Sequence, residues 1–310
     1  MSSSFLKSGM ISAMEQRIEI LPGLHTWVNI AGDLGSGVPL VLVHGGPGYP
    51  SDYLSGLDAL AQPNRPVIRY DQIGCGRSDP LDDRSKWTVQ TFIDELEVLR
   101  SHLGVETMHL LGHSWGGWVV LEYALAHHDR LSSLIVASSC ASMPNFIHET
   151  RRLITTLPPE SQQAITRAES SGDYSHDNYR AAKKAWAKRY LCRATPYPAR
   201  LALADKHMNA AIYTHMWGPS EFSCTGILQD WDVSDRLGEI TVPTLLTSGS
   251  HDEFTPVLQE QMRGAITGSR WIQFADSAHL AMVEEPNRYL QEIDDFLTSA
   301  SGGAFTNSVK

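Results

Sequence analysis

Cysteine is scarce in this chain of 310 residues, which has only four. Cys75, Cys140, Cys192 and Cys224 are scattered without a paired spacing. Zinc clusters and disulfide-rich small domains both depend on closely spaced cysteines, so neither is indicated. We expect four reduced thiols. Cys75 lies between two glycines, so it is either a small buried hydrophobe or an exposed reactive thiol.

Long apolar runs and concentrated positive charge are also missing. No segment approaches the length that spans a membrane, and residues 1–14 lack the apolar run of a signal peptide. The formal net charge of −10 argues against a nucleic-acid partner, which requires a basic face. One basic stretch, residues 183–189, is interpreted as the solvated face of a helix. We therefore expect a cytoplasmic protein without a membrane or nucleic-acid partner.

The apolar residues that are present form a pattern of strands and helices. Residues 15–21 and 25–31 flank Pro22-Gly23 and predict an N-terminal hairpin. An apolar stripe over residues 88–103 predicts a helix, and another predicts a last helix that begins at Pro286. Short apolar runs typical of buried parallel strands occur at 38–43, 66–70, 108–111, 134–137, 243–247 and 271–274. This alternation predicts an α/β fold, with a mostly parallel sheet covered by helices.

One long interruption divides this pattern. Between residues 142 and 222 the strand signal gives way to polar helical stretches broken at prolines and glycines. We interpret this segment as an inserted helical cap. The expected organisation is a core with its first part at 1–141, a cap at 142–222, and the second part of the core at 223–298. The Gly- and Ser-rich tail at 299–310 is expected to be disordered.

Residues 112–116 have the sequence Gly-His-Ser-Trp-Gly, a Gly-x-Ser-x-Gly motif. Such a motif places a serine on a sharp turn between a strand and a helix, with its hydroxyl projecting above the sheet. The predicted strand at 108–111 and the helix-forming run at 118–126 supply that context. The pattern therefore predicts that Ser114 is a nucleophile.

A serine nucleophile needs a base that is itself oriented by a carboxylate. Asp252 and His279 each follow one of the last two predicted strands, in the chain order serine, acid, histidine. They are our candidates, and His251 and Asp276 are the competing base and acid. We expect His113 and His44 to be structural supports.

A second glycine-rich turn, His-Gly-Gly-Pro-Gly at residues 44–48, follows the strand at 38–43. Acyl transfer creates an oxyanion, which preorganised N–H groups stabilise. We assign this oxyanion hole to the amides of Gly46 and Trp115, with Gly45 as the alternative first donor. Residues 74–76 lack the third glycine of a dinucleotide-binding fingerprint. No metal or organic cofactor is expected, since a serine triad needs neither.

Together these motifs resemble the proline iminopeptidase family of α/β-hydrolases, which includes the tricorn-interacting aminopeptidase and bacterial L-amino-acid amidases. The resemblance runs from about residue 15 to 298 and rests on the turns at 44–48, 70–78 and 112–117 and on the loops of Asp252 and His279. The cap resembles the tricorn-interacting branch at residues 170–174 and 217–222.

The resemblance implies a binding site for a free amine. In the family two glutamates hold the N-terminal amine of the substrate, and the matching positions are Glu221 and Glu253. Two converging carboxylates repel each other unless a cation lies between them, and an ammonium group is such a cation. Trp217 and Phe222 are candidates for an apolar slot that holds a proline ring.

The implied activity is hydrolysis of the amide bond after an unblocked N-terminal amino acid, preferably proline, through an acyl-enzyme on Ser114. The partner would be a small molecule or short peptide with a free N-terminus. The motifs leave open whether the leaving group is a peptide, an arylamine or ammonia, and they do not indicate an oligomeric state. The alternatives are an esterase or lactonase of a natural-product pathway and a non-catalytic ligand-binding homologue.

Overall fold

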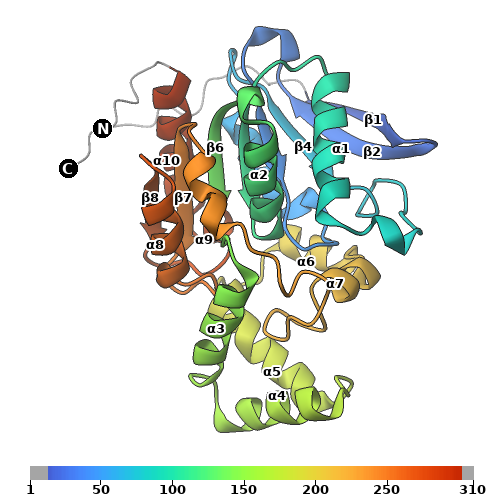
Figure 1. Cartoon of the computed structure of the whole chain (residues 1–310), viewed down its shortest axis with the longest axis vertical. Coiled ribbons are helices and arrows are strands. Elements are labelled where there is room, and N and C mark those ends of the chain that lie inside the picture. The colour runs from blue at the N-terminus through green and yellow to red at the C-terminus, as the bar shows by residue number, and fades with distance from the viewer. Residues whose placement is uncertain (1–12, 302–310) are drawn as a thin grey trace.

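A computed structural model describes residues 13–301, which contain a sheet with strand order β1-β2-β4-β3-β5-β6-β7-β8 (Figure 1). The strands are β1 Ala13–Leu21, β2 Leu24–Ala31, β3 Leu40–Val43, β4 Val67–Asp71, β5 Met108–His113, β6 Leu131–Ala137, β7 Thr244–Gly249 and β8 Arg270–Phe274. β2 is antiparallel to β1 and β4, and the other neighbouring strands are parallel. The N-terminal hairpin and the mostly parallel sheet are thus confirmed.

Helices cover both faces of this sheet, as predicted. The apolar side chains of α1 (Val89–His102), α2 (Trp115–Ala126) and α8 (Pro256–Ala265) belong to one core cluster. Those of the 3-10 helix η2 (Ser51–Leu60), α9 (Ala281–Glu284) and α10 (Pro286–Ser301) belong to a second cluster. Along β3, Val41 and Val43 join the first cluster, and Leu40 and Leu42 join the second. Burial on both faces explains why these strands are continuous apolar runs.

Between β6 and β7 the chain leaves the sheet and forms a series of helices. These are α3 Met143–Ile154, α4 Pro159–Ser171, α5 Asp177–Trp186, the π-helical turn η5 Ala187–Leu191, α6 Ala199–Lys206 and α7 Ala210–Met216. Figure 1 shows α3, α4 and α5 projecting from one end of the sheet layers, with α6 and α7 nearer to the core. A separate apolar cluster contains Ile165, Tyr179, Trp186 and Phe222. All of these elements fall within 142–222, the segment that we assign to the cap.

The expectation of a disordered tail from residue 299 is wrong for its first three residues, because α10 continues to Ser301. Ser299 and Ser301 each donate a side-chain hydrogen bond to a carbonyl of the same helix, over 2.8 Å to Phe296 and 2.9 Å to Leu297. These bonds satisfy hydroxyl groups that would otherwise favour a turn. Residues 302–310 lie outside the described residues.

All four cysteines are free and buried, so the expectation of thiols holds in the described structure. Burial raises the pKa of the Cys75 thiol well above its usual value, which favours the buried hydrophobe over the reactive thiol. In the part of the chain that is described, no helix has the length and apolarity needed to cross a membrane.

Candidate active site

Ser114 occupies the sharp turn between β5 and α2, with φ 57° and ψ −124°. A positive φ is strained for a residue with a side chain and persists only where the surrounding structure enforces it. Glycines on both sides allow the close packing of this turn. A Cβ atom added to Gly112 would lie 2.2 Å from the carbonyl oxygen of Gly116, and one added to Gly116 would lie 2.3 Å from that of Val43. The Gly-x-Ser-x-Gly motif is therefore a steric requirement of the turn.

The predicted base and acid lie together. Nδ1 of His279 is 3.0 Å from Oδ1 of Asp252, whose carboxylate is fully buried and also accepts the N–H of Phe254 over 3.0 Å. Ser114 and His279 line the same cavity. Within the described structure Ser114 makes no side-chain hydrogen bond to His279, a contact that commonly tightens only when substrate binds. The competing residues His251 and Asp276 are exposed and do not line this cavity.

The cavity has a volume of about 810 Å³, within the size range of small-molecule sites. The core contributes the turn at Gly45 and Gly46, together with Ser114 and His279. The opposite wall comes from the cap and includes Trp186, Tyr213, Glu221 and Phe222. A substrate at Ser114 is thus enclosed between the core and the cap.

The proposed oxyanion donors have free N–H groups. In the described part of the chain no acceptor binds the amide of Gly46 or of Trp115. The amide of Gly45, the alternative donor, is engaged, since it donates to the hydroxyl of Tyr53 over 2.6 Å. A Cβ atom on Gly45 would lie 2.9 Å from Cβ of Ser114, so the turn approaches the nucleophile closely. These contacts favour Gly46 over Gly45.

Tyr53, which the sequence analysis missed, takes part in a chain of three hydrogen bonds that begins at the amide of Gly45. Its hydroxyl is 2.9 Å from Nδ1 of His113, and Nε2 of His113 is 3.0 Å from the carbonyl oxygen of His279. A carbonyl only accepts, so Nε2 carries the proton, and Tyr53 donates to Nδ1. Burial and the nearby His279 ring hold the pKa of His113 well below its usual value, which fits a neutral ring. His113 therefore joins the oxyanion turn to the loop of the base.

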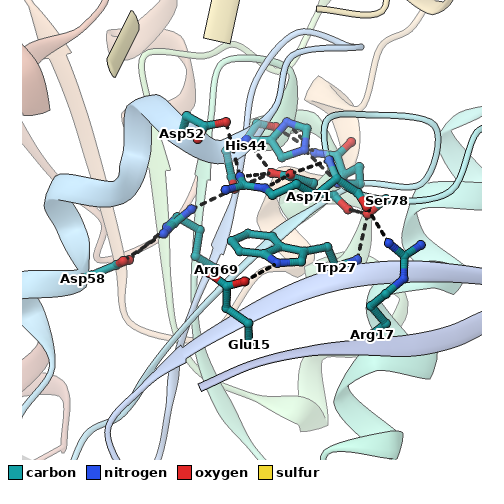
Figure 2. Close-up of polar contacts among 12 residues, drawn as sticks. Glu15, Arg17, Trp27, His44, Asp52, Asp58, Arg69, Asp71 and Ser78 are labelled. Carbon is teal, nitrogen blue, oxygen red and sulfur yellow. Dashed lines mark hydrogen bonds and ion pairs between the residues drawn. The ribbon is translucent and has the colours of Figure 1, made fainter. Parts of the chain in front are cut away.

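Residues at the end of β4 and directly after it support the turn at residues 44–48. Gln72 donates its backbone N–H to Nε2 of His44 and its side-chain amide to the carbonyl of His44, each over 2.8 Å, and accepts the indole N–H of Trp115 over 2.9 Å. Asp71 accepts from the Ser51 amide and hydroxyl over 2.8 and 2.5 Å. Figure 2 shows His44 and Asp71 of this network, with Ser78 and Trp27 close by. His44 has the structural position expected of it, and Gln72 is a support that no motif indicated.

The two glutamates are close to each other but differ in their access to the cavity. Glu221 lines it, whereas Glu253 is fully buried and accepts the indole N–H of Trp186 over 2.7 Å through Oε2. Oε1 of Glu253 has no partner among the described residues. Burial, followed by the charge of Glu221, raises the pKa of Glu253 well above its usual value. Burial also raises the pKa of Glu221, against the lowering effects of Tyr213, His279 and Lys183.

The structure separates the two aromatic candidates. Trp217 does not line the cavity and instead packs in the core, with ring centroids 5.4 Å from Trp118 and 5.5 Å from Phe146. Phe222 does line the cavity, and its ring lies 5.1 Å from that of Trp186. The apolar wall is thus formed by Phe222 and Trp186 rather than by Phe222 and Trp217. Trp186 belongs to the basic stretch at residues 183–189, which the sequence analysis interpreted as the solvated face of a helix.

Comparisons with known proteins agree with this geometry. The family described as alpha/beta hydrolase fold matches residues 38–286. A proline iminopeptidase from Heyndrickxia coagulans is 39% identical over 266 residues, which cover 86% of this chain and 92% of the relative. A proline iminopeptidase from Saccharolobus solfataricus is 38% identical and covers 92% of each chain.

Two solved structures are also similar. The crystal structure of a proline iminopeptidase from Mycobacterium smegmatis has a TM-score of 0.85 and 34% identity, with coverage of 94% of this chain and 100% of that one. The crystal structure of VinJ has a TM-score of 0.88 and 35% identity, with coverage of 93% and 99%. The chain therefore belongs to the proline iminopeptidase family of α/β-hydrolases.

Proposed function

We propose that this protein is a serine hydrolase that removes an unblocked N-terminal amino acid, preferably proline, from a small amide or short peptide. Ser114, His279 and Asp252 supply the groups of a catalytic triad, and the amides of Gly46 and Trp115, which have no acceptor among the described residues, are available as oxyanion donors. The relatives named proline iminopeptidase support the choice of substrate. We also propose a cytoplasmic location, with which the unpaired buried cysteines agree.

We infer the reaction from the chemistry of these groups. His279 accepts the proton of Ser114 as Oγ attacks the carbonyl carbon, and Asp252 stabilises the imidazolium that forms. The amides of Gly46 and Trp115 hold the oxyanion, where a single donor is worth about 3 kcal/mol. His279 then protonates the leaving amine, and the acyl-enzyme remains on Ser114. A water molecule deprotonated by His279 releases the amino acid by the same steps in reverse order.

Selectivity for a free amine rests on one observation, the pair of neighbouring carboxylates at Glu221 and Glu253. Their pKa values are raised because both are buried, and in the case of Glu253 because the other carboxylate is near. An ammonium group beside them would relieve this repulsion and pair with Oε1 of Glu253. The apolar wall of Trp186 and Phe222 would then contact the side chain of the bound residue.

Steady-state kinetics on a prolyl arylamide and its N-acetyl derivative test this proposal. Acetylation removes the charge and adds bulk at the clamp, so we expect kcat/KM to fall at least about 100-fold, as for loss of a buried charge contact. Equal rates for the two substrates would refute the amine clamp. Labelling by a fluorophosphonate tests the nucleophile separately. A folded wild-type protein that is not modified at Ser114 would indicate a non-catalytic binding protein instead.

A further inference from the structure

The wall of the active-site cavity that comes from α5, η5 and the segment after η5 is basic. Five basic residues line the cavity, against only two acidic ones, Asp205 and Glu221. The basic lining residues are Arg180, Lys183, Lys184, Lys188 and Arg193. This concentration stands out in a chain whose formal net charge is −10. Three of the five, Lys183, Lys184 and Lys188, fall in the stretch at 183–189 that the sequence suggested was a solvated helix face.

Two of these cations are already engaged. Arg180 forms an ion pair with Asp177 and donates to the carbonyl of Ser175. Lys183 donates to the carbonyl of Pro219 over 3.4 Å and is near enough to Glu221 to lower the pKa of that carboxyl. Lys183 therefore belongs to the part of the cavity beside Glu221.

The other three cations, Lys184, Lys188 and Arg193, are exposed and form no ion pair within the described structure, and Arg193 has an acidic neighbour, Glu284, which accepts its backbone N–H. The remaining acidic lining residue, Asp205, forms no ion pair with them in the described structure and instead accepts hydrogen bonds from Tyr49 and Tyr197 over 3.2 and 2.8 Å. We name Lys184, Lys188 and Arg193 the basic rim. A group of cations without ion pairs in a cavity wall attracts anions, and the low-dielectric walls strengthen its field.

We propose that the basic rim binds the free C-terminal carboxylate of a short peptide whose N-terminal residue lies at Ser114. This inference rests on the proposed function and specifies its substrate class. The glutamate pair is complementary to the ammonium end of a zwitterionic peptide, and the rim is complementary to its carboxylate end. The glutamate pair and the basic rim lie at or beside the same cavity. Its volume of about 810 Å³ limits the peptide to a few residues. The preferred leaving group is then an amino acid or short peptide with a free carboxylate, rather than ammonia or an arylamine.

Paired substrates test this proposal, because Pro-Gly and Pro-Gly-NH₂ differ only in the terminal charge. For the wild-type enzyme we expect kcat/KM to be about three- to tenfold higher for the acid, the size of a few solvated charge contacts, and we expect this preference to shrink at high salt. Tripeptide and tetrapeptide pairs, each an acid and its amide, show which length brings the carboxylate to the rim.

The variant K184Q/K188Q and the variant R193Q should each reduce the preference for the acid, mainly through a higher KM for the acid. The matched control R167Q/K206Q removes two exposed charges of the cap that do not line the cavity, and should retain the preference. Equal rates for acid and amide at every length in the wild type, or an equal preference in the rim variants, would overturn the proposal. Cleavage of neither substrate, nor of prolinamide, would instead refute the proposed function.

Discussion

Among single residues, Glu253 offers the most direct test of the proposed amine clamp. It is fully buried, one oxygen lacks a partner among the described residues, and burial and Glu221 raise its pKa. The substitution Glu253→Gln keeps an oxygen that can accept from Trp186 but removes the charge. We expect kcat/KM for a prolyl arylamide to fall about 30- to 1,000-fold, equivalent to about 2–4 kcal/mol of lost charge pairing.

A simple acetate ester provides the control for this variant. It has no amine, so its hydrolysis by Glu253→Gln should stay within about threefold of the wild-type rate, provided that the triad geometry is intact. Both rates come from steady-state kinetics on the same preparation. Equal losses on the two substrates would show that Glu253 supports the site in general, and would favour an esterase or lactonase over an aminopeptidase.

Tyr53 allows a second test at this scale. Tyr53→Phe removes the hydroxyl that accepts from Gly45 and donates to His113, so two buried polar groups lose their partner. We expect the free energy of unfolding to fall by about 1–3 kcal/mol. We also expect kcat to fall more than KM changes, since the variant loosens the turn of Gly46 and the loop of His279. Urea unfolding and steady-state kinetics measure the two effects.

Tyr70→Phe is the matched control for Tyr53→Phe. The hydroxyl of Tyr70 is also buried but has no hydrogen-bond partner within the described structure, so its removal should be neutral or stabilising. If the two variants lose the same stability and activity, the chain of hydrogen bonds through Tyr53 has no special role.

Among the helices and strands, those that a local residue pattern determines could be predicted from the sequence. The bounds of the six predicted core strands differ from those of β3 to β8 by three residues at most. The turn with Ser114 between a strand and a helix was equally predictable, because its Gly-x-Ser-x-Gly motif is local, although the clash that requires Gly116 is with Val43 of another strand. Apolar periodicity and turn chemistry act over a few residues, so one sequence is enough to recognise them.

Residues whose role depends on tertiary placement were not predictable in this way. Tyr53 lies in a 3-10 helix without a motif, and Gln72 reaches His44 and Trp115 only after three segments have come together. Trp217 and Trp186 show the same limit, since nothing local distinguishes an indole in the core from one in the cavity wall. The basic stretch is exposed, as expected, yet part of it faces the cavity.

The helix α1 carries a buried carboxyl that makes stability depend on pH. Glu95 is 2% exposed and accepts from the Ile73 amide over 2.8 Å and from the Thr26 hydroxyl. Burial raises its pKa from 4.5 to about 8. Between these values the folded protein retains a proton that the unfolded chain has lost. The free energy of unfolding therefore decreases as pH rises from about 4.5 to about 8, and this contribution levels off above pH 8.

The substitution Glu95→Gln should remove this part of the pH dependence. The amide cannot ionise and retains an oxygen for Ile73 and Thr26, so the variant should gain stability relative to the wild type as pH rises from 5 to 8. We expect a relative gain of about one to a few kcal/mol over that window. Urea unfolding at several pH values between 5 and 9 provides the measurement. Parallel curves for the two proteins would mean that Glu95 is ionised in the native state.

For the whole molecule, part of the cap has an apolar cluster of its own, separate from the two clusters that cover the faces of the sheet. The cap cluster consists only of residues from 153 to 222, and no sheet residue contributes to it. Polar contacts join the two parts: Trp186 donates to Glu253, Thr255 donates to Glu149 over 2.8 Å, and the amide of His279 donates to the carbonyl of Tyr190 over 3.2 Å. A unit with its own small core can open without unfolding the rest of the protein.

We therefore expect hydrogen exchange to separate the two parts, with α4 and α5 opening at a lower free energy than β3 and β5. Trp186→Phe keeps an aromatic ring in the cap cluster but removes the indole N–H that binds Glu253. This variant should accelerate exchange in α5 and η5 while exchange in the central strands stays unchanged, because only the contact between cap and core is weakened. Native-state exchange read by mass spectrometry measures both regions at once. A single opening free energy for cap and sheet, or equal acceleration of exchange in both in the variant, would show that the cap and the sheet unfold as one cooperative unit. Access to Ser114 would then not depend on separate motion of the cap.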